Sequence, residues 1–293
     1  MQLSRSYLYV PADKESVVQK SGSRGADALI LDLEDAVAPE SKPVAREIVT
    51  KVLATGIEGA GDLWVRINPP SLERGAMTTT DIAAAVSERT VGLIVAKTES
   101  AADVEFVRRT VEDVCRARDL ELGRIGLAPI VESPSGIENL REIARANGVV
   151  RLNFGEVDAI ASLGLEPSED ELELLAFRSA VVVASAAAGL GPPAGSVFRD
   201  WSDDEGLRRT SLRLRRLGFF GRSVIHPAQI ATVHEVFTPS EDELVRARRI
   251  ADRYESELAK GNGVYSDEVD GTMVDIAVVR AAWRTLEMGG HGN

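Results

Sequence analysis

The sequence predicts an α/β protein, and more narrowly a (β/α)8 TIM barrel followed by a C-terminal helical and hairpin extension. Short runs rich in Val, Ile, Leu and aromatic residues alternate with amphipathic helical stretches, as in parallel βα repeats. Eight such runs occur between residues 6 and 227, which matches the strand number and size of this barrel. The alternation stops after Phe237.

The predicted strands are short apolar runs, and Gly or Asn lies near the ends of several intervening helical stretches, as helix C-termini prefer. They are SYLYVP (6–11), ADALILDLED (26–35), DLWVRIN (62–68), VGLIVAK (91–97), RIGLAPIVES (124–133), VVRLNFGE (149–156), GSVFRDW (195–201) and RSVIHP (222–227). The seventh run has the weakest β pattern. Residues 1–237 therefore form the predicted barrel domain.

Residues 238–293 form the predicted C-terminal extension. A charged helical stretch (240–261) precedes GVYSDEVDGTMV (263–274), which suits a small hairpin, and a second helical stretch (276–287) follows. The apolar residues of these segments need another protein surface that removes them from water. We expect the extension to pack on the barrel or on a neighbouring subunit.

Composition excludes several classes of protein. The net charge of −12 opposes general attraction to nucleic acid or to an acidic membrane surface. No stretch reaches the roughly 18 apolar residues of a membrane span, and the first residues lack the pattern of a signal peptide. The single cysteine, Cys115, falls in a helical pattern and suits an inert thiol. We expect a cytoplasmic protein with no nucleic-acid or membrane partner.

Charged side chains follow most of the predicted strands at their carboxyl ends, where the active sites of such barrels lie. The clearest case is VESPSG (131–136), in which Glu132 ends an apolar run. An ionised carboxylate is costly to bury unless it is paired or binds a metal. The charged and polar residues that share this rim are Asp32, Glu34, Asp35, Arg66, Asn68, Lys97, Glu99, Glu132, Glu156, Asp158 and His226.

Two of these carboxylates, Glu132 and Asp158, follow adjacent strands, which lie about 4.8 Å apart. Mg²⁺ takes one or two protein carboxylates and leaves positions for substrate oxygens. Zinc fits poorly, because Cys115 is the only cysteine and the three histidines have no ligand spacing. The alternative for either carboxylate is a helix cap or a solvated rim charge.

Seven motifs in chain order support a family resemblance: RSYLYVPADKESVVQKSGSRGADALILDLEDAV, VRIN, AKTES, VESPSG, FGEVDAIASLG, GFFGRSVIHPAQI and DGTMVD. From Arg5 to Asp275 the chain resembles the citrate lyase β-subunit-like (CitE-like) branch of the HpcH/HpaI aldolase family, which includes malyl-CoA and citramalyl-CoA lyases. It departs at Ala96, where Pro is common, and at Gly195 and Ser196, where an acidic residue often stands.

The resemblance implies a carbon–carbon lyase that depends on Mg²⁺, with Mn²⁺ as an alternative. Its substrate would be a 3-hydroxyacyl-CoA thioester of the malyl-, methylmalyl-, citramalyl- or citryl-CoA type, made from an acyl-CoA and a 2-oxo acid. Glu132 and Asp158 would be the metal ligands. Asp275 of GTMVD would act as acid/base in the site of a neighbouring subunit, which implies a homo-oligomer, with a trimer favoured.

The remaining candidate residues follow from the chemistry of cleavage. Arg66 would hold an oxyanion through charge-assisted hydrogen bonds. Glu34 and Asp35 would orient Arg66 or metal-bound water, or only cap the next helix. The CoA phosphates would need cations, for which the candidates are Arg5, Lys14 and Lys97; solvated surface lysine is the alternative for Lys14.

Three other functions stay open at this point. The chain could be a citrate lyase β subunit that acts on an acyl-carrier-protein thioester within a complex. It could be a metal-dependent aldolase that acts on 2-oxo acids without CoA. It could also be a non-catalytic binding protein that keeps the barrel.

Overall fold

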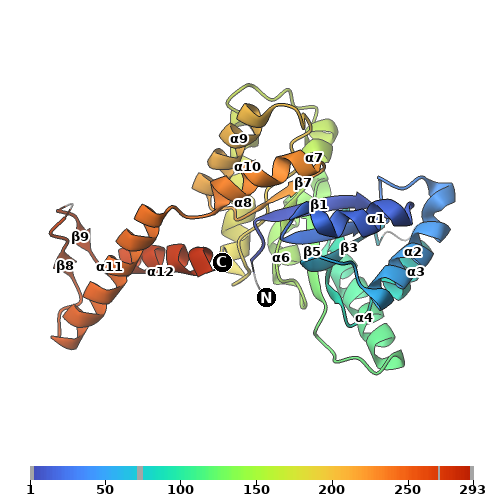
Figure 1. Ribbon diagram of the computed structural model, residues 1–293, viewed down its shortest axis with the longest axis horizontal. Helices are drawn as coiled ribbons and strands as arrows, with labels where there is room; N and C mark the ends of the chain where they lie inside the picture. The colour runs from blue at the N-terminus through green and yellow to red at the C-terminus, as the bar shows by residue number, and fades with distance from the viewer. Residues whose placement is uncertain (1–2, 71–74, 270, 291–293) are drawn as a thin grey trace. The chain divides into compact units, whose positions relative to one another are not determined.

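The computed structural model describes residues 3–70, 75–269 and 271–290, and the chain divides into two compact units. One unit comprises Ser4–His234, and the other is made chiefly of the residues from Glu235 onward. The predicted domain boundary after residue 237 lies at the end of helix α10 (Ile230–Phe237). Figure 1 shows the elements of both units, which are described separately below.

The larger unit contains a seven-stranded parallel sheet, which confirms the predicted α/β class. The strand order is β6-β5-β4-β3-β2-β1-β7, so strands consecutive in the chain from β1 to β6 are neighbours, and β7 lies beside β1. The strands are β1 (Ser6–Pro11), β2 (Ala28–Asp32), β3 (Asp62–Ile67), β4 (Thr90–Val95), β5 (Gly126–Val131), β6 (Asn153–Phe154) and β7 (Arg222–Val224).

The predicted strand over 195–201 is wrong. Only isolated bridges form there, from Ala194 to Asn153 of β6 and from Gly195 to Arg222 of β7. Two prolines, at 192 and 193, precede this segment, and proline has no N–H to donate to a ladder. The strand predicted over 149–156 is likewise reduced to β6, Asn153–Phe154.

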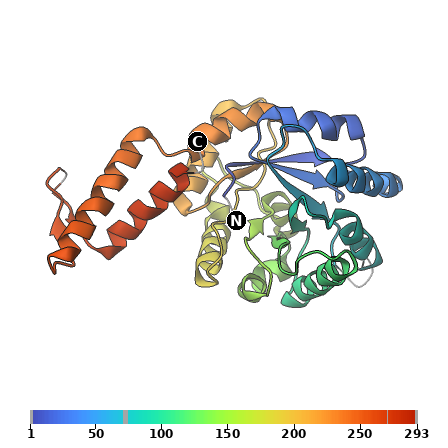
Figure 2. The ribbon, with the colours of Figure 1, turned by 60° about the horizontal axis from the view of Figure 1, so that its bottom comes forward.

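Helices follow the strands and lie on the outer side of the sheet, as Figure 2 shows for the blue and teal helices of the first half. This arrangement covers the outer face of the strands, as parallel sheets require. The helices of this unit are α1 (Glu15–Ser21), α2 (Lys42–Thr55), α3 (Gly75–Ala85), α4 (Ala101–Ala117), α5 (Pro134–Glu138), α6 (Leu140–Arg145), α7 (Glu156–Leu163), α8 (Leu172–Ala187) and α9 (Asp204–Leu217), with α10 at the boundary.

The inner face of the sheet is filled by apolar side chains from successive strands. Its cluster of buried residues is Tyr7, Ala28, Ile30, Trp64, Ile94, Ala128, Ile130 and Ala194. Within a strand these residues are spaced by two, because alternate side chains point to the same face. The cluster forms a floor beneath the carboxyl ends of the strands.

The C-terminal unit contains α11 (Glu241–Ala259), the strands β8 (Tyr265–Ser266) and β9 (Met273–Val274), and α12 (Ile276–Gly290). The two strands pair in antiparallel fashion, as the predicted hairpin requires. Ser240 and Glu243 form a capping box that begins α11. Among the helices of the described residues, none has the length and apolar content that a membrane crossing needs.

Candidate active site

The polar side chains of the candidate site continue the inward-facing series of the apolar floor. Ile30 belongs to the floor and Asp32 comes two residues later on β2; Ile130 and Glu132 have the same relation at the end of β5. The two-residue period of a strand therefore directs these polar groups to the space above the floor. Side chains placed in this way are Tyr9, Asp32, Arg66 and Glu132.

Arg66 and Asp32 are opposite each other in the parallel register of β2 and β3. Arg66 donates two hydrogen bonds to the Asp32 carboxylate, at 2.7 and 2.6 Å, and its Nη1 lies 3.0 Å from Oε2 of Glu34. The guanidinium carbon also lies 4.8 Å from the centre of the Tyr9 ring. These contacts hold the guanidinium in one orientation, and burial is outweighed by its carboxylate partners, which raise the pKa of Arg66.

Lys97 links the other carboxylates of this side of the site. Its Nζ lies 2.5 Å from Oε1 of Glu34 and 3.0 Å from Oδ2 of Asp35. Burial raises the pKa of Glu34, whereas the hydrogen bonds from Lys97 outweigh burial and lower the pKa of Asp35. Lys97 is thus paired with two carboxylates, which leaves its predicted contact with a CoA phosphate without support. Glu34 contacts Arg66, and the roles of Glu34 and Asp35 in orienting Arg66 stay predictions.

Glu132 is buried and held from two directions. The backbone N–H of Lys97, a residue with φ of 47°, donates to Oε1 of Glu132 at 2.8 Å. Gly155 lies beside the same carboxylate, because Val131 and Phe154 are partners in register. A Cβ at Gly155 would come within 2.2 Å of Oε2 of Glu132, so the space for this oxygen depends on glycine.

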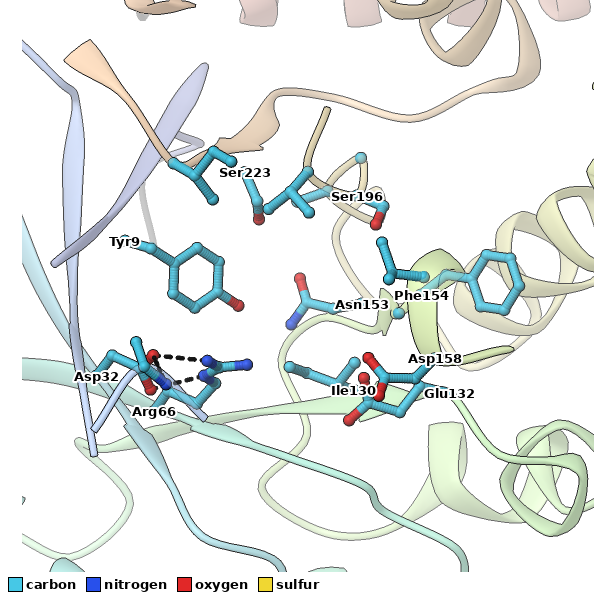
Figure 3. A pocket seen from close by; sticks show the side chains of 17 residues that line it. Tyr9, Asp32, Arg66, Ile130, Glu132, Asn153, Phe154, Asp158, Ser196 and Ser223 are labelled. Atoms are coloured by element: carbon cyan, nitrogen blue, oxygen red, sulfur yellow. Dashed lines mark hydrogen bonds and ion pairs between the residues drawn. The ribbon is translucent and has the colours of Figure 1, made fainter. Parts of the chain in front are cut away.

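Asp158 lies in the first turn of α7, and its carboxyl group lies beside that of Glu132 on the same side of the pocket (Figure 3). Burial, and then the charge of Asp158, raise the pKa of Glu132 to about 8. The residue that caps α7 is Gly155, and the carboxylate of Asp158 accepts no hydrogen bond from any residue that the structure describes. A capping role for Asp158 therefore finds no support.

Two neighbouring carboxyl groups with no Lys or Arg side chain among the described residues paired to either of them suit a divalent ion. A bound cation removes the repulsion and the cost of burying Glu132. In the described ranges, no cluster of three or more Asp, Glu, His or Cys side chains could hold a metal. A site with two protein carboxylates matches the donor set of Mg²⁺.

Asp32, Arg66, Glu132 and Asp158 line one cavity of about 190 Å³ at the carboxyl ends of the strands (Figure 3). Its wall also includes Tyr9, Asn153, Ser196 and Ser223, to which the sequence analysis assigned no role. Tyr9 could have been found, because it is two residues beyond Tyr7 on β1. Ser196 and Ser223 carry no such signal, since each lies near the start of its predicted strand and not at the carboxyl end, where site residues were expected.

Of the predicted site residues, Arg66, Glu132 and Asp158 line this pocket. Glu34, Asp35 and Lys97 form ion pairs next to Arg66 without lining it, Arg5 and Lys14 lie elsewhere in the same unit, and Asp275 belongs to the other unit. Arg5 precedes β1, at the amino end of the sheet, and pairs with Asp27 at 2.9 Å. Lys14 is exposed after β1, at the carboxyl end, but does not line the pocket. Asp275 belongs to the C-terminal unit, where it is exposed and accepts a hydrogen bond from the N–H of Ala277 at 2.9 Å.

Glu156, a further rim carboxylate, has a partner of its own. Arg178 of α8 donates two hydrogen bonds to it, at 2.8 and 2.7 Å, and both side chains are buried. Arg178 also pairs with Glu171 at 2.8 Å. Glu156 therefore ties α7 to α8 rather than facing the pocket.

Known proteins resemble this chain over most of its length. Residues 5–227 match the family model described as HpcH/HpaI aldolase/citrate lyase. The chain belongs to this family. The citrate lyase subunit beta of Haemophilus influenzae is 30% identical to it over 293 residues, which cover 100% of this chain and 99% of the relative.

Another family member, the L-malyl-CoA/beta-methylmalyl-CoA lyase of Rhodobacter capsulatus, is 34% identical over 301 aligned residues, which cover 96% of this chain and 93% of that enzyme. Among solved structures, CitE of Mycobacterium tuberculosis in complex with magnesium, acetoacetate and coenzyme A aligns with a TM-score of 0.77 and 28% identity. The alignment covers 98% of each chain. The predicted family resemblance is confirmed.

Proposed function

We propose that this protein is a Mg²⁺-dependent carbon–carbon lyase that cleaves or forms a 3-hydroxyacyl-CoA thioester of the malyl-, methylmalyl-, citramalyl- or citryl-CoA type. The observation that carries the proposal is the pair Glu132 and Asp158, which lie beside each other in the pocket that also holds Arg66. The relatives support it, because they include CoA-ester lyases and a CitE structure with magnesium and coenzyme A.

In the cleavage direction, the hydroxyl at C3 loses its proton and becomes a carbonyl, while the bond between C2 and C3 breaks. The electron pair of that bond passes to C2 as a thioester enolate, which then takes a proton. Mg²⁺ held by Glu132 and Asp158 would supply Lewis-acid polarisation of the substrate's oxygens. Arg66 would stabilise the developing oxyanion with the N–H groups that Asp32 and Glu34 leave free.

Other residues of the pocket would keep these groups in place. Lys97 would hold Glu132 through its backbone N–H and Glu34 through its side chain. Burial raises the pKa of the Tyr9 phenol, so Tyr9 would stay protonated and act as a hydrogen-bond donor at neutral pH. Because these groups are positioned before substrate binds, little reorganisation is needed during the reaction.

Proton transfer at C2 needs an acid/base other than Asp32, which is paired with Arg66, and the two proposed metal ligands. We propose Asp275 of a neighbouring subunit for this role, within a homotrimer, on the family resemblance. Lys14, exposed at the carboxyl end of β1, is the proposed contact for the CoA phosphates; Arg5 is not, since it lies at the other end of β1 and pairs with Asp27.

We also propose that the sheet closes into a complete (β/α)8 barrel through the segment at Ala194 and Gly195. The bridges from this segment to β6 and β7 support closure. So do the backbone hydrogen bonds from Gly195 N–H to Gly221 at 2.9 Å and from Ser223 N–H to Gly195 at 2.9 Å. A crystal structure with an open gap between β6 and β7 would refute closure.

Incubation of the purified protein with Mg²⁺, acetyl-CoA or propionyl-CoA and a 2-oxo acid tests the proposed activity. We expect a new 3-hydroxyacyl-CoA product by mass spectrometry, and its loss in EDTA and in the Glu132→Gln variant. The Glu138→Gln variant, which changes an exposed glutamate on α5, is the matched control. No product with any pair of substrates contradicts the proposal.

A citrate lyase β subunit that acts on an acyl-carrier-protein thioester is the second candidate, favoured by the full-length similarity to the Haemophilus influenzae subunit. A complex component would co-purify with other subunits and turn over the carrier-protein thioester but not CoA esters. An oligomer of this chain alone that turns over CoA esters excludes it. Activity with pyruvate and an aldehyde, without CoA, would instead indicate a CoA-independent aldolase.

A further inference from the structure

The wall of the pocket that lies across from Arg66 and Asp32 carries neutral polar groups. It includes Ser196, in the segment after the isolated bridges, and Ser223 of β7 (Figure 3). Neither hydroxyl has a hydrogen-bond partner among the residues that the structure describes. Ala194, Val197 and Ile225 line the pocket beside them, so the wall combines two hydroxyls with small apolar surfaces.

Of the described residues that line the pocket, Arg66 is the sole cation, and it is already paired with Asp32 and Glu34. The pocket lining also carries Asp32, Glu132 and Asp158. With these carboxylates ionised, as metal ligands must be, the lining has three negative charges and one positive charge. The net charge of the lining is then −2, and a bound divalent cation would bring it to zero.

Two other arginines are close in sequence to Ser196 and Ser223 but do not line the pocket. Arg222 is fully buried and directs its N–H groups to the Ser196 carbonyl at 2.8 Å and to the hydroxyls of Thr210 and Ser211 at 2.7 and 2.9 Å. Arg199 is exposed. Neither side chain belongs to the pocket lining.

We infer that the site takes a 2-oxo acid whose remaining substituent is small and uncharged, hydrogen or methyl, rather than a second carboxylate. This inference rests on the proposed function. The substrate's first carboxylate would have the divalent cation as its partner, whereas a second carboxylate would face neutral hydroxyls in a pocket whose described lining has no unpaired cation. Ser196 and Ser223 are thus specificity-determining residues.

The test measures kcat/KM for condensation of acetyl-CoA and propionyl-CoA with glyoxylate, pyruvate, oxaloacetate and 2-oxoglutarate, with Mg²⁺ present. We expect glyoxylate or pyruvate to exceed both dicarboxylic acids by at least about tenfold. Equal or greater turnover of oxaloacetate or 2-oxoglutarate overturns the inference while leaving the proposed lyase activity intact.

Calorimetric titration of pyruvate and of oxaloacetate into the Mg²⁺-loaded protein tests the inference independently of turnover. Tighter binding of pyruvate, by at least about tenfold, supports it; tighter binding of oxaloacetate overturns it. If no 2-oxo acid is condensed at all, the proposed function fails, and this binding preference still decides the inference about charge.

Adding a cation to the wall should reverse the preference. We expect Ser196→Lys to raise the ratio of oxaloacetate to pyruvate turnover at least about tenfold. Val183→Lys, at an exposed position of α8 (62%), adds the same charge outside the pocket and should leave the ratio unchanged. If Ser196→Lys does not fold, Ser223→Lys takes its place. An unchanged ratio in a folded variant overturns the inference.

Discussion

The candidate pocket and the residues next to it contain two groups of carboxylates with opposite electrostatic surroundings. On the paired side, Asp32, Glu34 and Asp35 contact Arg66 and Lys97. On the unpaired side, Glu132 and Asp158 lie beside each other, and the pKa of Glu132 rises to about 8 because of burial and the charge of Asp158. Carboxylates paired with a protein cation act as fixed structure, whereas buried carboxylates with no cationic side chain beside them indicate a place for an external cation.

The first turn of α7 shows the same contrast over two residues. Glu156 is buried and binds Arg178 through two hydrogen bonds, while Asp158 accepts none within the described chain. Both residues are acidic and both lie in the first turn of the same helix, so their different roles come from the elements that face them. α8 faces Glu156, and the pocket faces Asp158.

The largest effect is expected at the unpaired side. Glu132→Gln should abolish detectable lyase activity, a loss of at least about 10³-fold, because it removes a proposed metal ligand and the associated electrostatic stabilisation. It should also remove tight Mn²⁺ binding, measured by electron paramagnetic resonance, with an unchanged circular dichroism spectrum. Wild-type Mn²⁺ binding in this variant would refute the assignment of the ligand.

Changes at the two acidic residues of α7 should separate stability from metal binding. Arg178→Ala leaves Glu156 buried without a partner and should lower the free energy of unfolding by about 3–5 kcal/mol, measured by urea denaturation. Asp158→Asn should change that free energy by less than about 1 kcal/mol, because it breaks no pair, but it should weaken Mn²⁺ binding. A reversed pattern would mean that the two carboxylates have the opposite roles.

On the paired side, Lys97→Met should lower kcat by about 10–100-fold, as removal of a group that orients catalytic residues does. Its ammonium bridges Glu34 and Asp35, so its loss frees Glu34 and, through it, Arg66. Lys97→Arg should restore part of the rate, because the charge returns. Lys20→Met, at an exposed lysine of α1, is the control and should leave kcat unchanged.

A further effect is a pH dependence of the stability of the metal-free protein. The pKa of Glu132 is about 8 in the folded chain, above the value of about 4.3 in an unfolded chain. The folded state therefore binds the proton more tightly, so this contribution to stability is complete below about pH 4 and is lost as the pH rises to about 8.

Urea denaturation in EDTA measures this contribution as the stability of the wild type minus that of Glu132→Gln. The difference should fall between about pH 5 and pH 8, by at most about 1.4 kcal/mol per pH unit. A difference that rises over this range would contradict the assigned environment of Glu132. Saturating Mg²⁺ should remove the slope, since the bound ion replaces the proton.

Much of the fold was predictable because its signals are local. A buried parallel strand such as GLAPIV (126–131) is an apolar run, and a capped amphipathic helix such as Ala101–Ala117 shows its period within a few turns. The seventh strand was mispredicted because GSVFRDW has strand-like residues but follows two prolines. Its pairing is limited to the bridges at Ala194 and Gly195.

The rim carboxylates could likewise be found, since each follows a predicted strand, but their partners could not. Asp32 and Arg66 are 34 positions apart in the chain, and only the register of β2 with β3 sets them opposite each other. Lys97 was predicted to contact phosphate because a sequence shows its charge but not its neighbours. Ser196 and Ser223 went unassigned, since hydroxyls in a chain have no pattern that marks a pocket wall.

Strand and helix periodicity, the rim residues and the family motifs were thus readable from residue order, because each depends on neighbours within a few positions. Charge pairing was set only when the chain folded, because an ion pair depends on distances between residues from different strands and helices. Glu34 and Glu132 are the same amino acid at the same rim. Folding brought Arg66 and Lys97 to one and Asp158 to the other.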